Sequence, residues 1–118
     1  MPWTVLFADE FEPEFDALDE AVQDAILVRV LLLEHEGPSL GRPYADTLAG
    51  SKHANMKELR CNAAGGVWRI AIAFDPDRQA ILLVAGDKSG KNEKRFYKWL
   101  IAKADERFDR HLAMRKSR

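Results

Sequence analysis

Cysteine is nearly missing from this sequence. Cys61 is the single one among 118 residues, which excludes an internal disulfide framework and an all-cysteine metal site. One thiol also fits a reducing compartment. The three histidines, His35, His53 and His111, lie far apart with no partner at metal-ligand spacing, which argues against a zinc site.

Long apolar runs are missing as well. No stretch approaches the ~20 apolar residues that a membrane span requires. The opening MPWTVLFADEFEPEF becomes acidic early and has no basic head, so it does not resemble a signal peptide. We therefore expect a cytoplasmic protein that makes no use of a membrane. The stretch AGDKSGK, residues 85–91, lacks the spacing of a phosphate-binding loop, and no Gly-x-Ser-x-Gly elbow is present.

The remaining composition is that of an ordinary globular protein. Hydrophobic residues make up 47% and charged residues 31% of the chain, which is enough apolar material for a core without staples. The length predicts a single domain that spans residues 1–118.

The charge is distributed unevenly although the net value is only −1. Residues 9–36 hold ten acids and one base, Arg29, whereas residues 86–118 hold eleven bases and five acids. Such asymmetry is typical of a face that binds a polyanion. The alternative is that both segments are solvated helix faces without a ligand.

The hydrophobic pattern predicts an α+β domain in the order β-α-α-β-β-β-α. Residues 3–8 alternate like a strand, and the apolar residues of 9–36 recur every three or four positions like a helix. Pro13 is tolerated only in a first helical turn, so we expect two helices in this segment. Gly37-Pro38 supplies a stop signal.

The second half of the chain predicts an antiparallel sheet and a final helix. Residues 38–55 have weak periodicity and read as a long connection. Strands follow at 56–61, 67–75 and 80–86, joined by short linkers that favour an antiparallel arrangement, and a helix runs from 92 to about 112. Because the longer strands are apolar on both faces, we expect the two N-terminal helices and the C-terminal helix to cover the sheet.

Several cations are attached to this predicted sheet. Alternation puts Glu58 and Arg60 on one strand face, and Arg69 opens the next strand. Lys88 and Lys91 follow the last strand. If the strands are adjacent, these groups converge on one cationic surface suited to phosphate. For Arg60 and Arg69, a structural salt bridge with Glu58 is an equal alternative.

Four segments of the chain resemble a known family. GRPYADTLAGSKHANMKELR, WRIAIAFDP, ILLVAGDKSG and ADERFDRHL are similar to the RelE/ParE toxin superfamily, in particular to its phage-derived, HigB-like branch. The resemblance implies a toxin of a type II toxin–antitoxin module that cuts mRNA in the ribosomal A site without a metal or cofactor. It also implies a cognate helix-turn-helix, HigA-like antitoxin.

The resemblance also implies residue roles. Arg69 stands where the family's strand arginine stabilises the scissile phosphate, Arg60 is the arginine of the ELR signature, and Tyr97 is similar to a tyrosine that positions a base. The expected further nucleic-acid contacts are Lys52, Lys57, Lys88, Lys91, Lys94 and Arg95.

The catalytic base is left open between His53 and Glu58. The ribosome-dependent members carry two lysines on the strand that here has Met56 and Glu58, so a lysine mechanism does not transfer to this chain. Two other functions also remain: a gyrase inhibitor of the ParE type, which does not cut RNA, and a non-catalytic protein that only binds its antitoxin.

Overall fold

The computed structural model describes residues 2–117. Its elements, in chain order, are β1 (Thr4–Phe7), α1 (Phe11–Asp16), α2 (Glu20–Glu36), the 3-10 turn η1 (Gly37–Ser39), β2 (Ala45–Thr47), β3 (Met56–Ala63), β4 (Gly66–Phe74), β5 (Gln79–Asp87) and α3 (Glu93–Lys116). The predicted α+β class, with two N-terminal helices and one C-terminal helix, is confirmed.

The five strands form one sheet in the order β1-β5-β4-β3-β2. The pairs β2–β3, β3–β4 and β4–β5 are antiparallel, as predicted. The strand β1 pairs in parallel with β5, so the sheet is mixed at this edge. The short 64–65 and 75–78 linkers enforce the antiparallel pairs, whereas β1 is separated from β5 by most of the chain.

The expected order of elements was wrong at one place, because the predicted connection 38–55 contains the strand β2. This strand has three residues and pairs with β3 through Ala45 opposite Leu59 and Thr47 opposite Lys57. Three residues complete only one alternation, which is too short to produce a period-2 signal. The pairing with β3, rather than local sequence, makes this segment a strand.

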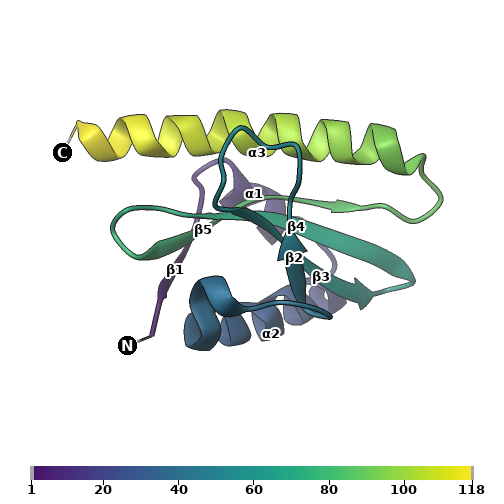
Figure 1. Ribbon diagram of the computed structural model, residues 1–118. Helices are drawn as coiled ribbons and strands as arrows, with labels where there is room; N and C mark the ends of the chain where they lie inside the picture. The colour runs from purple at the N-terminus through teal and green to yellow at the C-terminus, as the bar shows by residue number, and fades with distance from the viewer. Residues whose placement is uncertain (1, 118) are drawn as a thin grey trace.

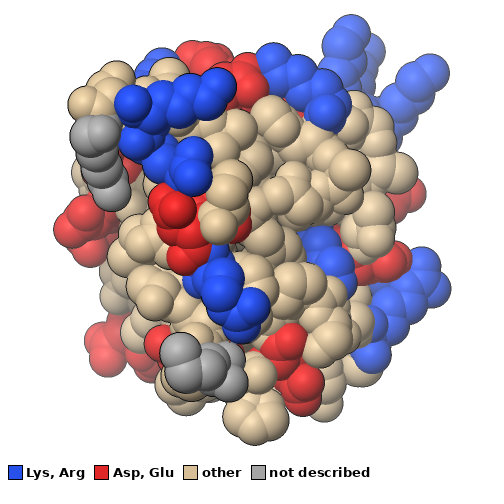
Figure 2. Space-filling view, turned by 60° about the vertical axis from the view of Figure 1, so that its left-hand side comes forward, with Lys and Arg blue, Asp and Glu red and all other residues tan. Residues whose placement is uncertain are grey.

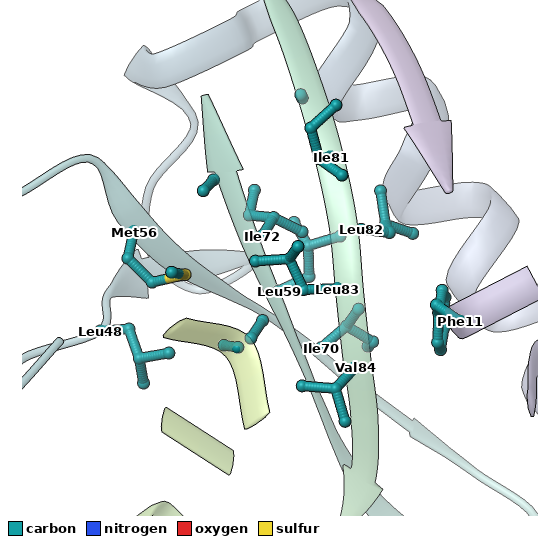
Figure 3. Packing of buried hydrophobic residues seen from close by; sticks show 14 of the residues in the cluster. Phe11, Leu48, Met56, Leu59, Ile70, Ile72, Ile81, Leu82, Leu83 and Val84 are labelled. Atoms are coloured by element: carbon teal, nitrogen blue, oxygen red, sulfur yellow. The ribbon is translucent and has the colours of Figure 1, made fainter. Parts of the chain in front are cut away.

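The sheet lies between helices, as Figure 1 shows: α3 runs along one face and α2 along the other. Because both faces are covered, β4 and β5 bury residues in succession rather than alternately. Figure 3 shows Ile70, Ile72 and Leu82 within this core, with Phe11 of α1 at its side. No helix within residues 2–117 is both long enough and apolar enough to cross a bilayer.

The predicted break and stop signals in the N-terminal helices are confirmed. Pro13 lies in the first turn of α1, and α2 ends at Glu36, directly before Gly37. Gly37 has a φ of +58°, and a Cβ at this position would collide with the indole ring of Trp3. Glycine is therefore required here by both backbone conformation and packing.

Candidate functional site

The strands β3 and β4 bring two arginines directly opposite each other. Arg60 of β3 is paired in register with Arg69 of β4, and Glu58 lies two residues before Arg60 on the same strand face. The helix α3 crosses this face and contributes Tyr97, whose hydroxyl reaches Glu58. We call Glu58, Arg60, Arg69 and Tyr97 the Glu58 cluster.

Glu58 is the centre of this cluster. It is only 3% exposed. Its Oε2 accepts a hydrogen bond from Arg60 Nη2 at 3.1 Å, and its Oε1 accepts one from the Tyr97 hydroxyl at 2.7 Å. Arg69 Nε lies 3.7 Å from Oε1. The salt bridge weighed as an alternative for these arginines therefore exists, and it also holds both guanidinium groups at one place.

The two arginines are incompletely satisfied within the described residues. Their Nε atoms are buried and have no hydrogen-bond partner there. The side chains of Arg60 and Arg69 are 28% and 12% exposed. An unpaired buried donor is costly, and native proteins keep few of them. The partly exposed guanidinium groups, held side by side, are suited to bind an oxyanion such as phosphate.

The environment also sets the protonation of the cluster. Burial acts to lower the pKa of Arg60, but the hydrogen bond and charge of Glu58 outweigh it, and the pKa is raised above its ordinary value. Burial, together with the hydrogen bond to Glu58, raises the pKa of Tyr97. Around neutral pH the cluster therefore holds a charged guanidinium and a protonated phenol.

Further cations surround the N-terminal end of α3. Lys88 Nζ pairs with Glu93 at 3.0 Å and lies 5.9 Å from the centroid of the Tyr97 ring. Lys91 lies over the ring of Phe96. Lys94 and Arg95 are exposed, and no acid within residues 2–117 pairs with either of them. These four predicted nucleic-acid contacts thus lie in the first turn of α3 or in the loop before it, and Lys88 is next to the Tyr97 ring.

Three arginines in the C-terminal half of α3 differ, because acids from other elements neutralise them. Arg107 pairs with Glu14 at 2.6 Å, Arg115 pairs with Asp77 at 2.6 Å, and Arg110 pairs with Glu10. Figure 2, in which the left-hand side of Figure 1 comes forward, shows basic and acidic side chains next to each other on that face. The basic last quarter of the sequence is therefore divided: three arginines in the C-terminal half of α3 are ion-paired, whereas Lys94 and Arg95 in its first turn have no acid partner within residues 2–117.

His53 and Lys52 lie away from the Glu58 cluster. His53 Nε2 is 2.8 Å from Asp109 Oδ1, and Lys52 pairs with the same carboxylate. Asp109 is twelve residues beyond Tyr97 in α3, which corresponds to about 18 Å along the helix. The structure does not bring these two predicted residues to the cluster. They attach the loop before β3 to α3.

Lys57 lies on the other face of the sheet. Its Nζ donates hydrogen bonds to the carbonyl oxygens of Pro38 at 2.6 Å and Leu40 at 2.7 Å. The alternation along β3 requires this, because Lys57 lies between Glu58 and Met56 in sequence. Lys57 therefore does not share a surface with Arg60 and Arg69.

Sequence reasoning missed several neighbours of the cluster. Asp46 of β2 lies 3.4 Å from Arg60 Nη2. Next to the start of β2, a cleft of about 340 Å³ opens at the sheet edge, lined by Arg29, Pro43, Tyr44, Arg60, Cys61, Asn62 and Arg69. These residues come from α2, a loop and two strands, so no local motif connects them. In the sequence, the one available signal for this cleft was Arg29, the lone base in the acidic segment 9–36.

Within residues 2–117, no group of three or more histidine, cysteine, aspartate or glutamate side chains has an arrangement that could hold a metal ion.

The sequence is related to known proteins. Residues 13–109 match the family described as phage-derived, Gp49-like protein. Two relatives come from Mycobacterium tuberculosis and are named as candidate toxins. The first, HigB2, is 46% identical over 99 residues, which cover 83% of this chain and 49% of the relative. The second, HigB3, is 47% identical over 109 residues, which cover 92% of this chain and 93% of the relative. The chain thus spans about half the length of HigB2 and nearly all of HigB3.

Two solved structures share the fold at low sequence identity. The RelE toxin of E. coli, solved as a mutant in the free state, has a TM-score of 0.62 at 12% identity, covering 87% of this chain and 97% of that one. The archaeal RelE of Pyrococcus horikoshii, solved in complex with RelB, has a TM-score of 0.56 at 16% identity, covering 76% and 99%. The chain therefore belongs to the phage-derived, Gp49-like family, is similar to HigB toxins and has the RelE fold.

Proposed function

We propose that this HigB-like toxin is a metal-independent endoribonuclease that cuts translated mRNA, and that the Glu58 cluster is its reaction centre. One observation carries the proposal: Arg60 and Arg69 face each other in register around a single buried carboxylate. Lys88 beside the Tyr97 ring, together with the unpaired Lys94 and Arg95, supplies the further phosphate contacts that a strand of RNA requires.

In this reaction the ribose 2′-hydroxyl attacks the adjacent phosphorus and forms a 2′,3′-cyclic phosphate. The bond from phosphorus to the 5′ oxygen breaks, and the 5′ oxygen departs with a proton taken from water. Arg60 and Arg69 compensate the negative charge that gathers on the phosphate oxygens. Tyr97 is half-buried and accessible, whereas Glu58 is enclosed. The phenol oxygen therefore takes the 2′-hydroxyl proton while its own proton passes to Glu58 along the 2.7 Å hydrogen bond. This assignment favours Glu58 over His53 as the final acceptor of the proton, because His53 lies at the far end of α3.

The test is to map RNA ends after the protein is induced in bacteria. The wild type should arrest growth and produce new 5′ ends within translated codons, and Arg69→Ala should abolish both without unfolding the protein. Arg110→Ala, which removes a paired cation in the C-terminal half of α3, is the matched control and should retain activity. Intact transcripts together with broken or relaxed DNA would refute the proposal in favour of a gyrase inhibitor.

We also propose that an antitoxin with a helix-turn-helix domain neutralises this protein in the cytoplasm. The support is the RelE fold, which one structural neighbour shows in complex with RelB. Co-expression with the product of an adjacent helix-turn-helix reading frame should restore growth. Continued growth arrest, with both proteins present at equal levels, would count against that partner.

A further inference from the structure

The cleft at the edge of β3 has an unusual lining. Three of its residues are arginines, Arg29, Arg60 and Arg69, and none of the lining residues is acidic. Arg60 and Arg69 pair with acids outside the lining, whereas no acid within residues 2–117 forms an ion pair with Arg29. A concave site with three guanidinium groups, one of them without an ion pair, has a positive potential that favours an anionic ligand. Its volume of about 340 Å³ falls within the range of small-ligand sites.

Fixed contacts hold the outer wall of this cleft in place. Arg29 Nε donates a hydrogen bond at 2.7 Å to the carbonyl oxygen of Arg60, and the Arg29 guanidinium lies 4.9 Å from the centroid of the Tyr44 ring. The backbone amide of Arg60 in turn donates to the carbonyl oxygen of Tyr44 at 2.8 Å. Arg29 and Tyr44 are therefore positioned by the same strand residue that belongs to the reaction centre.

The chemistry of the wall is that of nucleotide recognition. The Tyr44 ring is 41% exposed and offers a surface on which a base can stack. Asn62 is exposed and lies on the same face of β3 as Arg60, because the two are separated by one residue. Its amide can both donate to and accept from the edge of a base.

We infer that this cleft is a nucleotide subsite of the RNA site: Tyr44 stacks on the base next to the cleaved phosphate, Asn62 hydrogen-bonds its edge, and Arg29 adds a positive charge. This inference rests on the proposed ribonuclease function. A protein ligand is less favoured because Arg60 and Arg69 line both the cleft and the reaction centre. One continuous ligand with a phosphate at the arginines and a base at Tyr44 accounts for both.

Two measurements test the subsite. The first is the affinity of the free protein for a short fluorescent single-stranded RNA. Tyr44→Leu removes the ring and should weaken binding about tenfold, the effect expected for loss of one stacked base. Tyr44→Phe retains the ring and should bind like the wild type. Thermal denaturation confirms that each variant is folded.

The second measurement is the nucleotide pattern at the cut sites in a translation reaction programmed with an mRNA of varied codons. Asn62→Ala should relax the nucleotide preference at one position next to the cut while cutting continues. If the wild type cuts no mRNA, the ribonuclease proposal fails, and the RNA affinities still test the cleft. Unchanged RNA affinity in folded Tyr44→Leu overturns the proposed subsite, and so does an unchanged cut pattern in Asn62→Ala. Variants that weaken only the binding of the antitoxin also overturn it.

Discussion

Glu58 shows how one buried carboxylate organises a cationic site. Alone, two arginines in register on adjacent strands would repel each other. Glu58 accepts a hydrogen bond from Arg60 and lies 3.7 Å from Arg69, so the pair is stabilised without being fully neutralised. The sequence predicted the residues of this cluster but not that Glu58 lies at its centre. Neither the burial of Glu58 nor its contact with Tyr97, 39 positions later, has a local signal.

At this scale we expect Tyr97→Phe to reduce cleavage strongly. The substitution retains the ring and its packing but removes the hydroxyl that bonds Glu58. Loss of a positioned proton-transfer group costs about 10²- to 10⁴-fold in rate. The measurement is the rate of mRNA cutting at equal protein concentration. A wild-type rate in Tyr97→Phe would show that Tyr97 acts only through its ring.

At the scale of elements, the contact between α3 and the sheet positions the site. Gly86 of β5 is paired with Arg69, and the rings of Phe96 and Trp99 pack directly against it. This close approach lets α3 place Tyr97 over Glu58. The sequence predicted α3 and its apolar face, but the crossing point depends on side chains from two distant segments. Gly86 has no side chain, and its absence makes space for α3.

We therefore expect Gly86→Ala to destabilise the protein. The new Cβ would lie 2.7 Å from Trp99 and 2.8 Å from Phe96, and overpacking of this kind costs about 2 kcal/mol. The free energy of unfolding in urea measures the effect. Gly41→Ala is the matched control, because the nearest atom to its added Cβ is 3.9 Å away. Equal stability of the two variants would contradict the close packing of α3.

The β4–β5 pair also contains a β-bulge that contacts α3. The register shifts between Ala71 and Ile72, which pair with Val84 and Leu82, so Leu83 is the extra residue of a bulge. The Leu83 carbonyl oxygen accepts a hydrogen bond from Arg107 Nη1 at 2.8 Å. Arg107 also holds Glu14 of α1. The bulge, the last helix and the first helix are thereby connected through one buried arginine.

At the scale of the whole molecule, this connection predicts a dependence of stability on pH. The hydrogen bond from Arg107 lowers the pKa of Glu14 below its usual value of 4.5. A depressed carboxyl pKa stabilises the folded protein above the unfolded pKa, and this contribution is lost as the pH falls through the folded one. Glu14→Gln should therefore be less stable than the wild type at pH 7, by about 1 kcal/mol after allowance for solvent screening.

The difference between Glu14→Gln and the wild type should shrink as the pH is lowered from 6 to 3, which urea unfolding at several pH values can measure. Glu12→Gln is the control, since Glu12 has no ion-pair partner within residues 2–117. A difference for Glu14→Gln that stays constant over this pH range would refute the linkage.

The sequence by itself determined the helices, the three long strands and the family, because apolar periodicity and short linkers act locally and the motifs extend over most of the chain. The tertiary structure decided which charged side chains lie at the candidate site. Lys57 faces away from the site, Lys52 and His53 attach a loop to α3, and Arg29 joins the cleft from α2. These outcomes depend on strand register and on where the helices cross the sheet. Both are set by contacts between residues far apart in sequence, so no pattern along the chain records them.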